Sequence, residues 1–246
     1  MNETYALHDI AELLEDNSYP GRGIIIGETA DGKKAVTAYF IMGRSENSRN
    51  RVFEETGEDL IIYPADESKV EDPSLIIYKP IRRFENRLIV TNGDQTDTIY
   101  EFLKEGKSFG EALTTREFEP DAPNYTPRIS GMLTFFEEKG EKVFRYKLSI
   151  LKSADEKGSA CNRFTYSYSP LRGTGHFIHT YKCDGNPIPT FEGEPERITV
   201  DDDMETFAKK IWSALNSDNK ISLYVRYIDI ETGECENLLF NKYTRK

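Results

Sequence analysis

The first half of the chain alternates short apolar runs with turn residues. Residues 5–15 place leucine and isoleucine at helical spacing, which predicts a short amphipathic helix. The next apolar runs are short and rich in β-branched residues, and turn signals such as Asp31-Gly32 separate them. They predict strands at residues 23–27, 35–42, 60–63, 75–78 and 87–91. Helical patterns then follow at residues 97–104 and 108–115.

Strands return in the second half of the chain, around one clear helix. Apolar runs predict strands at residues 129–136, 142–151, 164–168 and 175–181. Residues 204–215 carry apolar side chains on one helical face, and three aspartates directly before them suit a helix N-terminus. A hairpin ends the pattern, with strands at 223–230 and 237–240 and a turn at Thr232-Gly233.

The order of these elements indicates the fold class. Strands and helices fall in blocks, without the strict strand–helix alternation that a parallel α/β sheet requires. The sequence therefore predicts an α+β fold with mostly antiparallel sheets that helices cover. We see no internal repeat, low-complexity tract or long linker in residues 1–246, so we expect a single domain.

Composition and charge narrow the range of partners. The 32 Lys and Arg residues face 43 Asp and Glu residues, and the net charge of −11 argues against nucleic acid or an anionic membrane as partner. No apolar run approaches the roughly 20 residues of a membrane-spanning helix, and residues 1–4 do not start a signal peptide. Cys161, Cys183 and Cys235 are odd in number and widely spaced, which is typical of reduced thiols. We therefore expect a cytoplasmic protein.

The chain lacks the sequence motifs of several enzyme classes. It has no dinucleotide-binding GxGxxG after a strand, no phosphate-binding GxxxxGK[ST], no GxSxG and no HExxH. His176 and His179 are three residues apart on a predicted strand, so they would face opposite sides of it and would not share a metal. We therefore expect neither a metal nor an organic cofactor.

An arginine-rich segment, residues 43–51, follows the predicted strand at 35–42. It holds Arg44, Arg49 and Arg51 among serine and asparagine residues, and Glu46 is its one opposite charge. Arginine binds a phosphate or a carboxylate through two parallel hydrogen bonds, so the segment suits an anionic ligand. A solvated strand end would have a similar composition, and this segment alone does not separate the two interpretations.

Four further segments combine polar or aromatic side chains with predicted strand ends. Arg22 stands at the head of the first strand, and Tyr78 lies beside a lysine at the end of another. Residues 91–98 have the composition of a turn followed by a helix cap. A polar loop that contains Glu119 leads into the strand that starts near Arg128, and such loops often carry functional sites, although ordinary surface loops share their composition.

Taken in order, these segments resemble the archaeal-type IMP cyclohydrolase family. The similarity runs from residue 19 to residue 129, and residues 1–18 resemble an added N-terminal helix. The motifs are Tyr19-x-Gly21-Arg22, Arg44-Ser45 with Asn50-Arg51, Ile77-Tyr78, Thr91-Asn92-Gly93-x-x-Thr96-Asp97-Thr98-Ile99, and Glu119 before Thr126-Pro127-Arg128-Ile129. The resemblance implies a four-layer αββα sandwich like that of N-terminal-nucleophile hydrolases. It also implies that the protein closes the formamido-imidazole-carboxamide ribonucleotide FAICAR to IMP, with loss of water and no cofactor.

The resemblance further implies roles for particular residues. Arg51, Tyr78 and Glu119 match the catalytic positions of the family. Tyr78 would donate to the developing oxyanion, and Glu119 would orient the carboxamide or accept a proton. The expected substrate-binding residues are Arg22, Arg44, Arg49, Asn50, Asn92 and Arg128. We expect seven side chains from separate segments to meet in one cleft between the two sheets: Arg44, Asn50, Arg51, Tyr78, Asn92, Glu119 and Arg128.

Two other functions stay open from the sequence. An amide hydrolase of the same fold class would need a nucleophile, and neither Cys161 nor Ser45 has a base nearby in the sequence. The chain starts at Met1-Asn2, so we expect no Ser, Thr or Cys N-terminus beside the first strand. A non-catalytic purine-nucleotide-binding protein would keep the pocket without turnover. The expected partner is a purine ribonucleotide, FAICAR or IMP, and the sequence is also compatible with a homo-oligomer.

Overall fold

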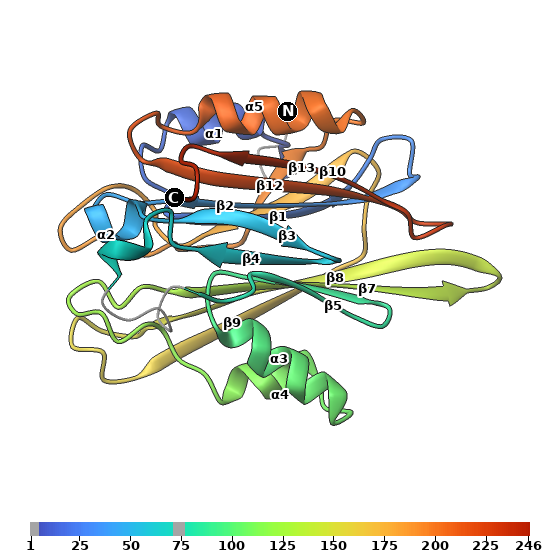
Figure 1. Cartoon of the computed structure of the whole chain (residues 1–246). Helices are drawn as coiled ribbons and strands as arrows, with labels where there is room; N and C mark the ends of the chain where they lie inside the picture. Colours follow the sequence, from blue (N-terminus) through green and yellow to red (C-terminus); the bar gives the residue numbers. More distant parts are fainter. Residues whose placement is uncertain (1–4, 71–76) are drawn as a thin grey trace.

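Two antiparallel sheets lie face to face at the centre of the molecule (Figure 1). The computed structural model describes residues 5–70 and 77–246, and the strands counted here are those of this part of the chain. The six-stranded sheet has the order β11 (Glu196–Thr199), β10 (Thr174–His179), β1 (Arg22–Glu28), β2 (Lys34–Met42), β12 (Lys220–Asp229) and β13 (Cys235–Asn241). The seven-stranded sheet follows the sequence, with β3 (Val52–Thr56), β4 (Asp59–Tyr63), β5 (Ile81–Phe84), β6 (Arg87–Thr91), β7 (Arg128–Glu138), β8 (Glu141–Ser153) and β9 (Cys161–Tyr168).

Helices cover the outer face of each sheet, so the molecule has four layers (Figure 1). The helices α1 (Ile10–Glu15) and α5 (Met204–Ala214) pack on the six-stranded sheet. The helices α3 (Gln95–Lys104) and α4 (Phe109–Thr114) pack on the seven-stranded sheet. Two short helices, α2 (Glu46–Arg49) and η2 (Glu67–Lys69), follow β2 and β4. The prediction of two antiparallel sheets with helices is confirmed.

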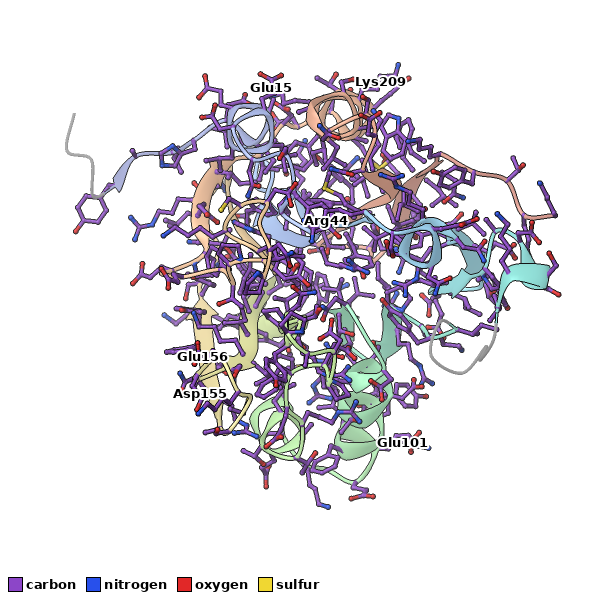
Figure 2. The ribbon with its side chains drawn as sticks, turned by 90° about the vertical axis from the view of Figure 1, so that its left-hand side faces the viewer. Glu15, Arg44, Glu101, Asp155, Glu156 and Lys209 are labelled. Carbon is purple, nitrogen blue, oxygen red and sulfur yellow. The ribbon has the colours of Figure 1, made fainter. Side chains whose placement is uncertain are left out.

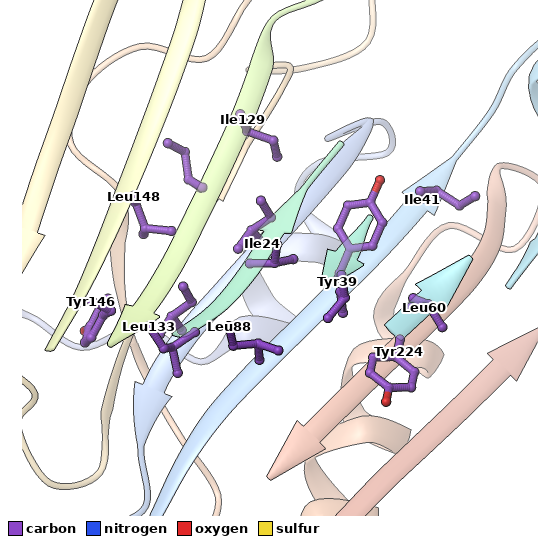
Figure 3. Close-up of a cluster of buried hydrophobic side chains, with 14 of the residues drawn as sticks. Ile24, Tyr39, Ile41, Leu60, Leu88, Ile129, Leu133, Tyr146, Leu148 and Tyr224 are labelled. Atoms are coloured by element: carbon purple, nitrogen blue, oxygen red, sulfur yellow. The ribbon is translucent and has the colours of Figure 1, made fainter. Parts of the chain in front are cut away.

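Apolar side chains fill the interfaces between the layers. Figure 3 shows part of the central interface, where Ile24, Tyr39 and Ile41 of the six-stranded sheet lie among side chains of the other sheet. The strand β1 contributes to two interfaces, because Ile24 and Ile26 face the other sheet whereas Ile25 packs beneath the helices α1 and α5. A strand buried on both faces needs no apolar–polar alternation, which explains the continuous run of three isoleucines.

The structure corrects two of the predicted elements. The helix expected over residues 5–15 begins only at Ile10, where the Asp9 carboxylate caps it by accepting a hydrogen bond from the Ala11 amide at 2.7 Å. Of the strand expected at residues 75–78, residues 75 and 76 lie outside the described residues. Tyr78 belongs to no strand and precedes β5, although its carbonyl accepts a hydrogen bond from Ile62 of β4.

Five short elements of the described structure were not predicted from the sequence. The strands β3, β5 and β11 contain mixed apolar and charged residues, and the helices α2 and η2 are polar segments of four and three residues. Runs of this length carry too weak a periodicity to be recognised in the sequence, and tertiary contacts stabilise them.

Candidate active site

The ends of several strands and the loops beside them surround one cleft at an end of the sandwich. Two adjoining cavities, of about 530 and 390 Å³, share Arg22, Arg51, Asp121 and Thr126 in their walls. Figure 2 views this end of the molecule, and Arg44 lies there between the helices of the two outer layers. The larger cavity lies beside the six-stranded sheet and the arginine-rich segment, and the smaller one lies beside Tyr78, Glu119 and the start of β7.

Two arginines of the shared wall have no ion-pair partner in the described part of the chain. Arg22, the first residue of β1, donates from Nη1 to the Met42 carbonyl at 3.0 Å, and Arg51 precedes β3 with its Nε buried and without a hydrogen-bond partner. Within the described residues, neither guanidinium has a carboxylate within ion-pair distance. Burial and the neighbouring Arg22 cation lower the pKa of Arg51, yet an arginine stays protonated at neutral pH. This wall therefore suits an anionic group of a ligand.

Arg44 lies at the rim of the larger cavity. Its Nη1 pairs with the Asp184 carboxylate and donates to the Gly185 carbonyl at 2.9 Å. Its guanidinium also lies over the Tyr19 ring, 5.0 Å from the ring centroid. Arg44 thus lines the cleft as expected, but a protein carboxylate already partly compensates its charge.

Arg49 and Asn50, two of the expected substrate-binding residues, do not line this cleft. Arg49 donates to the Gly43 carbonyl at 3.0 Å and to the Asn219 side chain at 3.3 Å. The Asn50 carboxamide exchanges two hydrogen bonds with the backbone of Asp66, at 2.9 and 2.7 Å. Both side chains fix the segment that carries Arg51, and the sequence pattern does not distinguish this structural role from ligand binding.

Tyr78 and Asn92 lie together in the wall of the smaller cavity. The Tyr78 hydroxyl donates to the Asn92 carbonyl at 2.8 Å and lies 3.3 Å from the Tyr39 hydroxyl. Burial raises the pKa of Tyr78, while the Arg51 and Arg22 cations oppose this effect. The phenol is therefore a neutral hydrogen-bond donor near an uncompensated cation, which suits a site where negative charge develops.

The Asn92 side chain makes three hydrogen bonds to the protein. Its Nδ2 donates to the Pro127 carbonyl at 2.8 Å, and its Oδ1 accepts from the Ile129 amide at 2.9 Å and from the Gln95 side chain at 3.0 Å. Asn92 therefore ties the turn after β6 to the start of β7, and we assign it a positioning role in this structure.

Glu119 and Arg128, which also line the smaller cavity, form an ion pair with 3.0 Å between Oε1 and Nη1. Burial raises the pKa of Glu119; the Arg128 cation opposes this, and the carboxylates of Asp94 and Asp121 add to it. A carboxyl group whose pKa is raised in this way is a candidate for proton transfer near neutral pH.

Gly93 leaves room for the Glu119–Arg128 ion pair because it has no side chain. A Cβ placed on Gly93 would lie 2.5 Å from Arg128 Nη1 and 3.2 Å from Glu119 Oε1. Residue 93 therefore has no room for a side chain while the ion pair keeps its position.

A family model described as an IMP cyclohydrolase-like protein matches residues 19–233. The chain belongs to the IMP cyclohydrolase-like protein family. The match begins after α1.

Three proteins named IMP cyclohydrolase show the extent of the similarity. The protein of Methanococcus aeolicus is 33% identical over 119 residues, which cover 47% of this chain and 58% of that protein. The protein of Methanopyrus kandleri is 28% identical over 184 residues, which cover 71% of this chain and 89% of that protein. The protein of Methanosphaera stadtmanae is 33% identical over 127 residues, which cover 50% of this chain and 60% of that protein. The chain thus spans less than two thirds of two of these relatives.

Within this IMP cyclohydrolase-like chain, the cleft also contains residues that the sequence analysis missed. Thr126 links two of them, since its hydroxyl lies 2.7 Å from the Tyr181 hydroxyl and donates to Asp121 Oδ2 at 2.5 Å. Burial raises the pKa of Tyr181 to about 12. Tyr181 also stacks on Tyr19, with 5.7 Å between the ring centroids. Tyr181 comes from beyond the segment of resemblance, so no motif pointed to it.

Asp94 is another residue of the cleft that the sequence analysis did not identify. The sequence suggested a helix cap at residues 91–98, yet Asp94, directly before α3, makes no side-chain capping bond. Its carboxylate instead contacts Arg116 and Arg128, at 2.6 and 2.7 Å.

Within the described residues, no group of three or more His, Cys, Asp or Glu side chains is arranged to hold a metal. No helix of the described chain is long and apolar enough to cross a membrane.

Proposed function

We propose that this IMP cyclohydrolase-like protein closes FAICAR to IMP with loss of water and without a cofactor. The observation that carries the proposal is the composition of the cleft, where the uncompensated Arg22 and Arg51 lie near a buried phenol, Tyr78, and a carboxyl of raised pKa, Glu119. The names of the relatives agree with this activity.

Ring closure forms one carbon–nitrogen bond and releases one molecule of water. A new bond forms between the carboxamide nitrogen and the formyl carbon, and the formyl oxygen then leaves as water with one hydrogen from the carboxamide and one from the formamide nitrogen. The reaction is intramolecular, so a site that holds both groups in contact supplies a large part of the acceleration. We assign the 5′-phosphate to Arg22 and Arg51, because neither guanidinium has a carboxylate of the described residues within ion-pair distance.

Tyr78 and Glu119 are our proposed catalytic residues, together with Arg51. Tyr78 would turn its one hydrogen from the Asn92 carbonyl to the formyl oxygen as that oxygen gains negative charge. Glu119 would accept the proton of the carboxamide nitrogen and return one to the leaving oxygen. We retain Arg44 and Arg128 as ligand-facing cations of the cleft, whereas the contacts of Arg49, Asn50 and Asn92 favour positioning roles.

The wider assignments are also proposals. A single central core between the two sheets supports one domain, and the four layers support a relationship to N-terminal-nucleophile hydrolases. The amide-hydrolase alternative gains no support, since the Ser45 hydroxyl caps α2 by accepting a hydrogen bond from Ser48. A cytoplasmic location and a homo-oligomer stay predictions.

A direct assay separates catalysis from binding. Purified protein is mixed with FAICAR in the presence of a chelator, and IMP is followed by its absorbance and identified by chromatography. We expect turnover that Glu119→Gln strongly reduces. Tight binding of IMP without any turnover would instead support the non-catalytic nucleotide-binding protein, and the absence of both would reject the proposal.

A further inference from the structure

One nitrogen of Arg128 is surrounded by three acceptors. Its Nη1 lies 2.7 Å from Asp94 Oδ1, 2.7 Å from Gln95 Oε1 and 3.0 Å from Glu119 Oε1. A terminal guanidinium nitrogen carries two hydrogens, and here both form hydrogen bonds, to Asp94 and to Gln95. The contact with Glu119 is an ion pair without a hydrogen bond, so Glu119 lies beside a cation that gives it no hydrogen.

Two arginines, Arg116 and Arg128, hold the Asp94 carboxylate in place. Arg116 Nη2 lies 2.6 Å from each oxygen of the Asp94 carboxylate, and Asp94 forms no capping bond to the backbone of α3. Arg116 and Arg128 keep the pKa of Asp94 low although burial opposes this, so the residue stays ionised. Asp94 is therefore a constant acceptor for Arg128.

We propose that Asp94 is a positioning residue for ring closure, which holds an Arg128 hydrogen away from Glu119 and so keeps Glu119 able to take and release a proton. This inference rests on the proposed function. Charged and titratable groups face Glu119 from all sides of the smaller cavity. They are Arg128 of β7, Asp94 before α3, Asp121 of the same loop, Arg22 of β1, Arg51 before β3 and Tyr78 before β5.

The loss of the Asp94 carboxylate has a defined direction. It would remove an anion near Glu119 and would free an N–H of Arg128 to bond the ionised Glu119 carboxylate. Both changes favour the ionised form, so the pKa of Glu119 should fall, by about 1 unit. Asp94→Asn removes the charge and can keep an acceptor, whereas Asp94→Ala removes both, so the alanine variant should show the larger fall.

The first test needs no substrate. The carboxyl carbons of glutamate are labelled with ¹³C, the Glu119 signal is assigned by its loss in Glu119→Gln, and its titration is followed by NMR. Asp97→Asn is the matched control, because Asp97 lies one turn further along α3, pairs with Arg82 at 2.6 Å, and has a side chain 56% exposed against 58% for Asp94. Equal Glu119 titrations in the parent and both Asp94 variants, or an equal fall in Asp97→Asn, would overturn the proposal.

A variant of Arg116 tests whether any disturbance of this turn changes the Glu119 titration. Arg116→Gln leaves Asp94 on Arg128 and removes a cation, so the pKa of Glu119 should not fall. A fall as large as in Asp94→Asn would mean that general disturbance of the turn causes the effect, and this would also overturn the proposal.

The second test uses FAICAR turnover. In Asp94→Asn, the limb of the pH–rate profile that belongs to Glu119 should move to lower pH, whichever protonation state is active. If the protein turns over FAICAR but the Glu119 titration is the same in Asp94→Asn as in the parent, the role of Asp94 is rejected and the proposed function stands. A shifted titration in a protein without turnover would reject the proposed function and leave the Asp94–Arg128–Glu119 coupling in place.

Discussion

At the scale of single residues, the side chains of the cleft differ in how many of their polar atoms the protein already uses. Arg51 has a buried Nε without a hydrogen-bond partner, whereas the carboxamide of Asn92 makes three hydrogen bonds to the protein. A side chain with unused donors can bind a ligand without breaking protein contacts, and this lowers the cost of binding. The cleft is therefore divided between residues available to a ligand and residues that hold them in place.

We expect Tyr78→Phe to lower kcat by about 10²–10³-fold while KM changes little, since the lost donor would act mainly on charge that develops in the transition state. Steady-state kinetics with FAICAR measure both constants. Tyr39→Phe is the matched control, because its hydroxyl contacts Tyr78 at 3.3 Å, and we expect a much smaller effect. A Tyr78→Phe enzyme with the parent kcat would remove Tyr78 from the mechanism.

We expect Arg51→Lys mainly to raise KM for FAICAR. Lysine keeps the positive charge but cannot form the two parallel hydrogen bonds of a guanidinium. Arg145→Lys serves as the control, because Arg145 is an exposed arginine of β8 that does not line the cleft, and its KM should stay close to that of the parent. Equal KM values for all three proteins would argue against phosphate binding by Arg51.

At the scale of elements, the sequence predicted the long, strongly apolar strands and α5 well. It did not identify which polar side chains of the connecting loops turn toward the cleft. Asp94 illustrates the difficulty, because a capping aspartate and one that bonds two distant arginines look the same in the sequence. Asn50 shows the reverse case, since a residue of the arginine-rich motif bonds the backbone at Asp66. Such contacts depend on partners far away in the chain.

The turn between β6 and α3 gives a prediction at this scale. We expect Gly93→Ala to fold but to lose most of its kcat, because the added methyl would push Arg128 and Glu119 apart. Gly110→Ala in α4 is the control, since its nearest neighbour lies 3.9 Å away and alanine favours a helix by about 1 kcal/mol. Thermal unfolding checks folding, and FAICAR kinetics check activity. A fully active Gly93→Ala enzyme would contradict the assigned geometry.

At the scale of the whole molecule, His176 links the two sheets. Its Nδ1 lies 2.7 Å from the Tyr146 hydroxyl on β8, and Tyr168 of β9 stacks on its ring. Burial, with a further contribution from the Arg197 cation, lowers the pKa of His176 from 6.5 to about 4. The folded protein therefore holds this histidine neutral, whereas the unfolded chain binds a proton below pH 6.5.

We expect the free energy of unfolding to fall as the pH drops from 6.5 to about 4, by up to about 3 kcal/mol from this group. His176→Gln should be less stable than the parent at pH 7, and the difference should shrink as the pH falls. Denaturant unfolding across this range measures the difference, with His8→Gln as the control on an exposed histidine. A difference that stays constant with pH would contradict the neutral, buried state of His176.

The division of the cleft between the two sheets has a mechanical consequence. Arg22 begins β1 and Arg44 follows β2 of the six-stranded sheet, whereas Tyr78, Glu119 and Arg128 lie at or just before the starts of strands β5 and β7 of the seven-stranded sheet. A ligand held at both ends acts as a non-covalent cross-link between two layers that otherwise adhere through apolar side chains. In the proposed complex with FAICAR the ribose would be the spacer between the two sheets, and the packing between the sheets would select ligands by their span.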